Sequence, residues 1–156
     1  MRLSHLQQQI RDLVEEKGLN WDDPGFQQQI VLLHSSISGI AKAYQDNQRT
    51  HELFRQAAEL LIRVAYFPAL YPDWGDIWGS QTLDDFQPGK EGKDIWENLY
   101  TMHQLVSGLV GGRSDIILLY KLVQIIRSAA TLLEVDLPRA VKTRMDAYWD
   151  ADKSLS

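Results

Sequence analysis

Hydrophobic residues recur three or four positions apart along most of this chain, which is the spacing of amphipathic helices. Ser4 is a candidate N-cap for the first helix, and Gly18 is a candidate end, because glycine readily adopts the left-handed conformation that follows many helices. The apolar positions of that helix are Leu3, Leu6, Ile10, Leu13 and Val14. Runs of the same kind predict further helices over residues 24–45, 51–67, 95–110, 115–134 and 137–149.

Candidate start signals precede several of these helices. Asp23 stands before Pro24, and Asp136 stands two positions before Pro138, so each aspartate is a candidate cap with proline in the first turn. Thr50 is a candidate cap in the same sense. No stretch alternates between apolar and polar residues for long enough to form a sheet. The pattern therefore predicts an all-α bundle of five or six helices, in a single domain that spans residues 1–156.

Two segments depart from the ordinary amphipathic pattern. Residues 115–134 are apolar on almost every side, so we expect this helix to be the most buried element. Residues 71–93 instead contain several prolines and glycines together with Trp74 and Trp78, which predicts a long ordered loop. The aromatic residues of this loop are expected to cap the core. The alternative is a partner surface, in which Trp74 and Trp78 are exposed anchors.

Composition narrows the class of protein. The net charge is −5 and the chain has no cysteine, which disfavours a broad nucleic-acid footprint and excludes disulfides and thiolate metal sites. No uninterrupted apolar run approaches the ~20 residues that span a bilayer. The first ten residues lack the apolar core of a signal peptide. We therefore expect a soluble cytoplasmic protein without a membrane partner.

Two parts of the chain echo each other. Residues 34–41 read HSSISGIA and residues 103–110 read HQLVSGLV; further along, residues 61–65 (LIRVA) match residues 125–129 (IIRSA). The approximate repeats cover residues 26–70 and 94–134, and they predict two helix pairs related by an internal two-fold axis. Chance is the alternative, because apolar helices share many residues through composition alone. His34 and His103, which begin the two echoes, are expected to be half-buried beside apolar helix faces.

Three segments also resemble the MazG-like all-α nucleoside triphosphate pyrophosphohydrolases. Residues 34–44 (HSSISGIAKAY) are similar to the first motif helix of that family, which commonly reads His-Ser-Glu-x-Ser-Glu-x-x-x-Ala-Tyr. Residues 56–63 (QAAELLIR) are similar to the second motif helix, Glu-Leu-Ala-Asp-Val-x-Ile-Arg, and residues 135–145 (VDLPRAVKTRM) resemble the closing helix. The resemblance covers most of the chain outside residues 71–93.

This resemblance implies a fold and a chemistry. In such enzymes, carboxylate pairs at i and i+3 on two facing helices hold Mg²⁺, which neutralises the triphosphate and activates water. The first pair falls here on Ser36 and Gly39, and the second on Gln56 and Glu59. Only Glu59 supplies a negative oxygen, so tight Mg²⁺ binding at this place should be lost and no cofactor is expected. The small residues Ser36, Gly39 and Ala43 should instead let a neighbouring helix approach closely.

Five residues are the candidates for ligand binding: Glu59, Gln56, Ser36, Arg63 and Arg144. No residue is a firm candidate for a metal ligand, and Glu59 is a weak one. Glu59 also precedes Arg63 by four positions, so an ordinary ion pair on one helix face competes with a ligand-binding role for either side chain. Other acids, including Asp84 and Asp85 of the loop, are a less favoured source of replacement ligands.

The sequence therefore favours a non-catalytic descendant of the MazG-like enzymes that acts by binding a nucleotide, a protein partner or another copy of itself. The resemblance implies a homo-oligomer, either a dimer or a tetramer. The first alternative is an active Mg²⁺-dependent nucleoside triphosphate pyrophosphohydrolase with rearranged ligands and Glu59 at its centre. The second is a structural or assembly protein that uses the loop around Trp74 and Trp78.

Overall fold

The computed structural model describes residues 1–22, 25–47, 51–88 and 94–151. Within these residues the chain forms six α-helices and no strand, so the prediction of an all-α bundle is confirmed. The helices are α1 (Leu3–Lys17), α2 (Phe26–Gln45), α3 (His51–Tyr66), α4 (Ile95–Ser107), α5 (Asp115–Leu133) and α6 (Leu137–Ala151). Three 3-10 turns lie between α3 and α4: η1 (Phe67–Leu70), η2 (Pro72–Trp74) and η3 (Leu83–Asp85).

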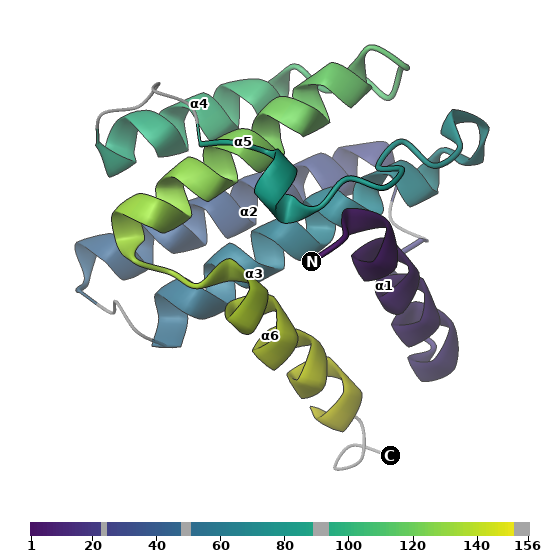
Figure 1. Ribbon diagram of the computed structural model, residues 1–156, viewed down its shortest axis with the longest axis horizontal. Coiled ribbons are helices and arrows are strands. Elements are labelled where there is room, and N and C mark those ends of the chain that lie inside the picture. Colours follow the sequence, from purple (N-terminus) through teal and green to yellow (C-terminus); the bar gives the residue numbers. More distant parts are fainter. Residues whose placement is uncertain (23–24, 48–50, 89–93, 152–156) are drawn as a thin grey trace.

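The helices are arranged as three stacked pairs (Figure 1). α4 packs on α5, α2 packs on α3, and α1 lies beside α6 on the other side of α3. Contacts between α2 and α4 and between α3 and α5 join the first two pairs into a four-helix unit. α3 also contacts α1 and α6, so this one helix touches every layer of the bundle.

The central helix is α3, and not α5 as the apolar pattern predicted. Ile117 of α5 is exposed, whereas α3 buries residues on almost all of its sides. The buried set of α3 includes Ala57, Ala58 and Ala65, which add little hydrophobicity to the sequence. Small side chains permit close approach by several neighbouring helices at once, which is why a pattern that counts large apolar residues underestimates the burial of α3.

The helix ends follow the predicted signals only in part. Gly18 has φ 64° and ends α1 in the left-handed conformation, as predicted. Asp136 caps α6, since its Oδ1 accepts a hydrogen bond from the backbone N–H of Arg139 at 3.2 Å. The prediction for Ser4 was wrong, because α1 begins at Leu3 and Arg2 precedes it without a side-chain cap. The candidate caps Asp23 and Thr50, and Pro24, lie outside the described residues.

The long segment after α3 is fixed to the bundle by specific hydrogen bonds. Arg127 of α5 donates through Nη1 to three backbone carbonyls of this segment, those of Leu83 (3.1 Å), Asp84 (3.3 Å) and Phe86 (2.9 Å). The start of the chain also pairs with the segment, because the N–H of Leu3 donates to the carbonyl of Gln81 at 3.2 Å. The described part of the predicted loop is therefore ordered by its surroundings and not by regular structure of its own.

One helix has the length and composition of a membrane span. α5 is long and apolar enough to cross a bilayer by these two criteria alone. The count of uninterrupted apolar residues missed it, because Lys121 divides the run. In the bundle α5 packs against α3 and α4, and core helices of water-soluble proteins meet the same criteria.

Candidate functional site

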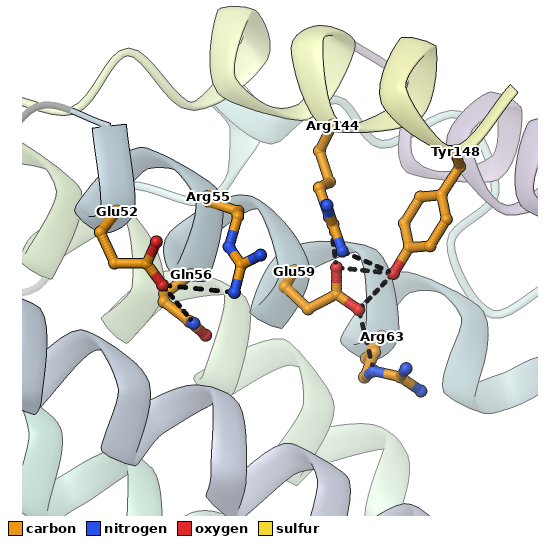
Figure 2. A network of polar contacts seen from close by, with 7 residues as sticks. All are labelled: Glu52, Arg55, Gln56, Glu59, Arg63, Arg144 and Tyr148. Carbon is orange, nitrogen blue, oxygen red and sulfur yellow. Dashed lines mark hydrogen bonds and ion pairs between the residues drawn. The ribbon is translucent and has the colours of Figure 1, made fainter. Parts of the chain in front are cut away.

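Glu59 lies at the centre of a polar network that joins α3 to α6 (Figure 2). Its carboxylate accepts hydrogen bonds from Arg144 Nε at 2.9 Å and from the Tyr148 hydroxyl at 2.6 and 2.8 Å. Arg63 Nε lies 3.2 Å from the same carboxylate, so the ion pair expected from the four-residue spacing is present. The Glu59 side chain is only 14% exposed, and both of its oxygens are occupied by protein donors.

This network fixes the charges of its members. Burial raises the pKa of the Tyr148 hydroxyl to about 12, and the adjacent charge of Glu59 adds to the shift. Burial by itself lowers the pKa of the Arg144 guanidinium, but the hydrogen bond and charge of Glu59 outweigh it, so that the pKa is raised overall. Tyr148 therefore stays a neutral donor and Arg144 stays a cation at neutral pH. A metal ion would have to displace these donors to reach the carboxylate.

Aromatic side chains extend the network to the segment after α1. The Arg63 guanidinium lies over the Trp21 ring, 4.6 Å from its centroid. Trp21 also packs edge-on against Tyr148, with ring centroids 5.4 Å apart. The hydroxyl of Tyr66 donates to Asp22 at 2.6 Å in the same region. Glu59 and its neighbours thus tie α3, α6 and residues 21–22 together.

The other predicted positions meet where α3 faces α2, on an adjoining side of the helix. A Cβ placed on Gly39 would lie 2.5 Å from the Cδ and Oε1 atoms of Gln56, so the end of the glutamine side chain occupies the space that a larger residue would take. Gln56 also donates to Glu52 at 2.9 Å. Ser36 is buried on the same helix as Gly39. The predicted close approach of α2 to α3 is present at Gly39.

The five candidate residues are therefore not a single cluster. Arg63 and Arg144 contact Glu59, whereas Gln56 packs on Gly39 at the α2–α3 interface. The resemblance placed Gln56 and Glu59 around one metal ion. Instead, Gln56 donates to Glu52 of α3 itself, and Glu59 binds Arg144 and Tyr148 of α6 (Figure 2). Within the described residues, no group of three His, Asp or Glu side chains could hold a metal ion.

Trp74 and Trp78 are core residues. Trp78 is fully buried, donates through Nε1 to the Ala65 carbonyl at 3.0 Å and stacks on Tyr120, and Trp74 is 8% exposed and stacks on Tyr71. The loop aromatics cap the bundle, as the first reading of the sequence expected. The alternative required exposed indole rings, and the structure contradicts that premise.

The two histidines that begin the sequence echoes touch each other. Nδ1 of His34 on α2 lies 2.7 Å from Nδ1 of His103 on α4, and the rings stack with centroids 4.9 Å apart. Burial lowers the pKa of His103, and the proximity of His34 lowers it further. This contact joins α2 to α4 at the first residue of each echo, and the two-fold relation of the repeats stays a prediction.

A groove of about 530 Å³ opens between α3 and α6, next to the Glu59 network. Arginine and histidine side chains dominate its polar lining, and no carboxylate belongs to it. Phe54 and two alanines make up its apolar part. The full lining is His51, Phe54, Arg55, Arg139, Ala140, Thr143, Arg144 and Ala147. Three arginines and one histidine thus line a groove that has no carboxylate in its lining.

Sequence reasoning named Arg144 but missed the residues that surround it. Tyr148 was not among the candidate residues, although its spacing of four from Arg144 indicates that both side chains can reach one neighbour. Arg139 stands five positions before Arg144, and Arg55 stands four positions before Glu59, so both could have been placed near the network once α3 and α6 were known to be adjacent. That adjacency was not available from local spacing.

Comparison of the chain with family models, with curated proteins and with solved structures found no match. The geometry of the described residues therefore carries the functional argument.

Proposed function

We propose that this chain is a non-catalytic relative of the MazG-like pyrophosphohydrolases that acts by binding, and that its principal interaction is with other copies of itself through the α2–α4 side of the bundle. A soluble cytoplasmic location is part of this proposal. The observation that carries the non-catalytic part is the state of the Glu59 carboxylate, which Arg63, Arg144 and Tyr148 already occupy.

The α2–α3 interface supports the same view. A pyrophosphohydrolase of this kind needs several carboxylates around an open space for Mg²⁺ and a triphosphate. In this chain, Gly39 and Gln56 stand at two of the four ligand positions, and their direct contact fills the space between the helices. At the position where the resemblance implies the metal site, α2 and α3 therefore pack directly against each other.

The surface of α2 and α4 supports binding between copies. Residues 25–41 and 98–112 contain no Asp, Glu, Lys or Arg, although 24% of the chain is charged. Val31 on α2 is 64% exposed and Tyr100 on α4 is 65% exposed, and Trp96 is exposed on the same helix. Depletion of charge and enrichment in aromatic residues are the compositional marks of a protein interface. Since each copy carries a net charge of −5, an uncharged face is where two copies can meet with least repulsion.

An assay of hydrolysis tests the non-catalytic part. The purified chain would be incubated with a panel of nucleoside triphosphates and Mg²⁺ or Mn²⁺, and release of pyrophosphate would be followed. We expect none above the rate without protein. Release that is lost in Glu59→Gln but retained in Glu16→Gln, which alters an exposed carboxylate on α1, would instead support the enzyme with rearranged ligands.

Mass measurement in solution tests self-association. We expect sedimentation velocity at micromolar concentration to give a dimer or tetramer for the unaltered chain and a monomer for Val31→Lys or Tyr100→Lys. Gln9→Lys adds the same charge at an exposed position of α1, on the far side of the bundle from α4, and should keep the unaltered mass (Figure 1). The proposed interface would be contradicted if the unaltered chain is a monomer. It would also be contradicted if Val31→Lys or Tyr100→Lys keeps the mass of the unaltered chain.

A further inference from the structure

The groove between α3 and α6 has a charge opposite to that of the chain as a whole. Arg55, Arg139 and Arg144 line it together with His51, in a protein whose net charge is −5. Placing like charges close together costs free energy, because the guanidinium groups repel one another. An anion that enters the groove relieves this repulsion, so the arrangement favours an anionic occupant.

The arginines differ in how far the protein already uses them. Arg144 is bound to Glu59 and Tyr148, and Arg55 lies 3.3 Å from Glu52 in an exposed pair. The guanidinium of Arg139 makes no hydrogen bond or ion pair with any other described residue; only its backbone N–H is bound, by Asp136. Arg139 is therefore the cation most available to a ligand, and Arg55 can turn toward the ligand by giving up a weak surface pair.

Helix direction adds to the positive potential. α3 begins at His51 and α6 begins at Leu137, and the two helices run in the same direction past each other (Figure 2). His51 and Arg139, both in the first turns of their helices, line the same groove. The N-terminal end of a helix carries a partial positive charge, so both dipoles favour an anion at this end of the groove.

The carboxylates close to the groove do not cancel this charge. Glu59 carries one negative charge against the two arginines that contact it, Arg63 and Arg144. Glu52 offsets Arg55 alone, so the charge of Arg139 is left in excess. Asp136, which caps α6, accepts the N–H of Arg139. None of the three belongs to the lining itself.

We propose that this groove binds a small molecule that carries a phosphate group, with the phosphate on Arg139 and Arg55 and an apolar or aromatic part against Phe54. A phosphate monoester carries about 1.5 to 2 negative charges and three acceptor oxygens, so it can engage two guanidinium groups where a single carboxylate satisfies one. The groove volume of about 530 Å³ is that of a small-molecule site and exceeds what a bare phosphate fills. The ligand-binding role expected for Arg144 is then positional, since Arg144 holds α6 against α3.

Calorimetric titration without metal ions tests the proposal. The probes are inorganic phosphate, an aromatic nucleoside monophosphate such as AMP, a sugar phosphate that lacks an aromatic ring, and benzoate as a carboxylate of similar apolar content. We expect AMP to bind most tightly, the sugar phosphate and phosphate more weakly, and benzoate not measurably. Equal affinities for AMP and the sugar phosphate would contradict the role of Phe54. Tighter binding of benzoate than of AMP would contradict the assignment of a phosphate ligand.

Two variants connect the binding to the groove. Arg139→Gln should weaken the binding of AMP about tenfold or more, because it removes a charge-assisted hydrogen bond to the phosphate. The Arg139 side chain is exposed and does not hold another helix in place, so the fold should be unaffected. Lys142→Gln is the matched control: it removes one positive charge from the same helix, but Lys142 lines a different groove, between α6 and α1, and should change the affinity less than twofold. Equal losses in both variants would show only the general effect of net charge and would overturn the site. Failure of all phosphate compounds to bind at millimolar concentration would also overturn it.

Discussion

Nδ1 of His34 and Nδ1 of His103 are 2.7 Å apart, a distance at which one nitrogen donates a proton to the other. Two nitrogens in such a contact share a single proton, so the doubly protonated pair places two N–H groups and two positive charges against each other. Ser107 Oγ lies 3.5 Å from Nε2 of His34. No Asp, Glu, Lys or Arg occurs within residues 25–41 or 98–112, so no charged side chain of these stretches compensates a second proton.

This contact predicts that the bundle loses stability on mild acidification. The folded state lowers the pKa of His103 below its ordinary value of 6.5, so the unfolded chain binds more protons as the pH falls through this range. The stabilising contribution is complete above pH 6.5 and declines as the pH falls toward the lowered folded value. Urea unfolding at about pH 7.5 and about pH 5.5 should show this loss.

Variants of the histidines check the cause of that pH dependence. The difference in free energy of unfolding between the two pH values should shrink in His103→Gln, because the unfolded and folded states then bind the same number of protons at that position. His5→Gln removes an exposed histidine of α1 and should leave the difference unchanged. A difference that is the same in all three proteins would assign the pH dependence to other groups.

Removal of the charge at Glu59 should destabilise the fold. Glu59→Gln leaves the partly buried guanidinium groups of Arg63 and Arg144 without a carboxylate, which should lower the free energy of unfolding by about 2–4 kcal/mol. Glu52→Gln, on the same helix, breaks an exposed pair and should cost about 0–1 kcal/mol. Chemical denaturation of both variants measures the contrast; equal, small losses would mean that the network does not hold α6 to α3.

The contact between Gly39 and Gln56 should couple two substitutions. Alanine favours a helix over glycine by about 1 kcal/mol, but in the unaltered chain the new Cβ would push the end of Gln56 away from Glu52. Gly39→Ala should therefore gain little by itself and about 0.5–1 kcal/mol in a Gln56→Ala background. A double-mutant cycle by urea unfolding gives the coupling energy, and a coupling of zero would mean that the two side chains do not compete for this space.

Arg127 should determine how firmly the segment after α3 is held. Arg127→Lys keeps the charge, but a single ammonium group cannot reproduce the bonds to the carbonyls of Leu83, Asp84 and Phe86, so we expect a loss of about 1–2 kcal/mol. Limited proteolysis should become faster within residues 81–88. Arg113→Lys alters an exposed residue that makes one bond to this segment, at Asp73, and should change neither result appreciably.

The parts of the molecule that depend on neighbours along the chain were predictable. Helix positions follow from apolar spacing, and the pair of Glu59 and Arg63 follows from a separation of four residues on one helix. The bonds of Glu59 to Arg144 and Tyr148 bridge 85 and 89 positions, and no periodicity in one helix indicates which other helix will lie against it. The groove could not be predicted for the same reason, since its lining comes from two helices that meet only in the folded chain.

One expectation about burial was wrong, and one alternative was ruled out, for related physical reasons. α5 was expected to be the most buried helix because large apolar residues surround it, but Ile117 faces solvent while α3 buries alanines. For Trp74 and Trp78, the expectation that they cap the core is confirmed, and the alternative of exposed anchors is not. Their indole rings complete the core, and Trp78 donates a hydrogen bond to the Ala65 carbonyl. Burial is a property of the assembled bundle, whereas composition describes only the segment.

The central place of α3 has a consequence for the chain as a whole. Because this helix contacts α1 and α2 from the first half and α5 and α6 from the second, neither half can cover it without the other. Two peptides that end and begin between α3 and α4, for example residues 1–88 and 94–156, should each be unstructured or aggregated in isolation. When mixed they should reassemble into one helical particle, so the protein offers a route to a two-fragment complementation pair.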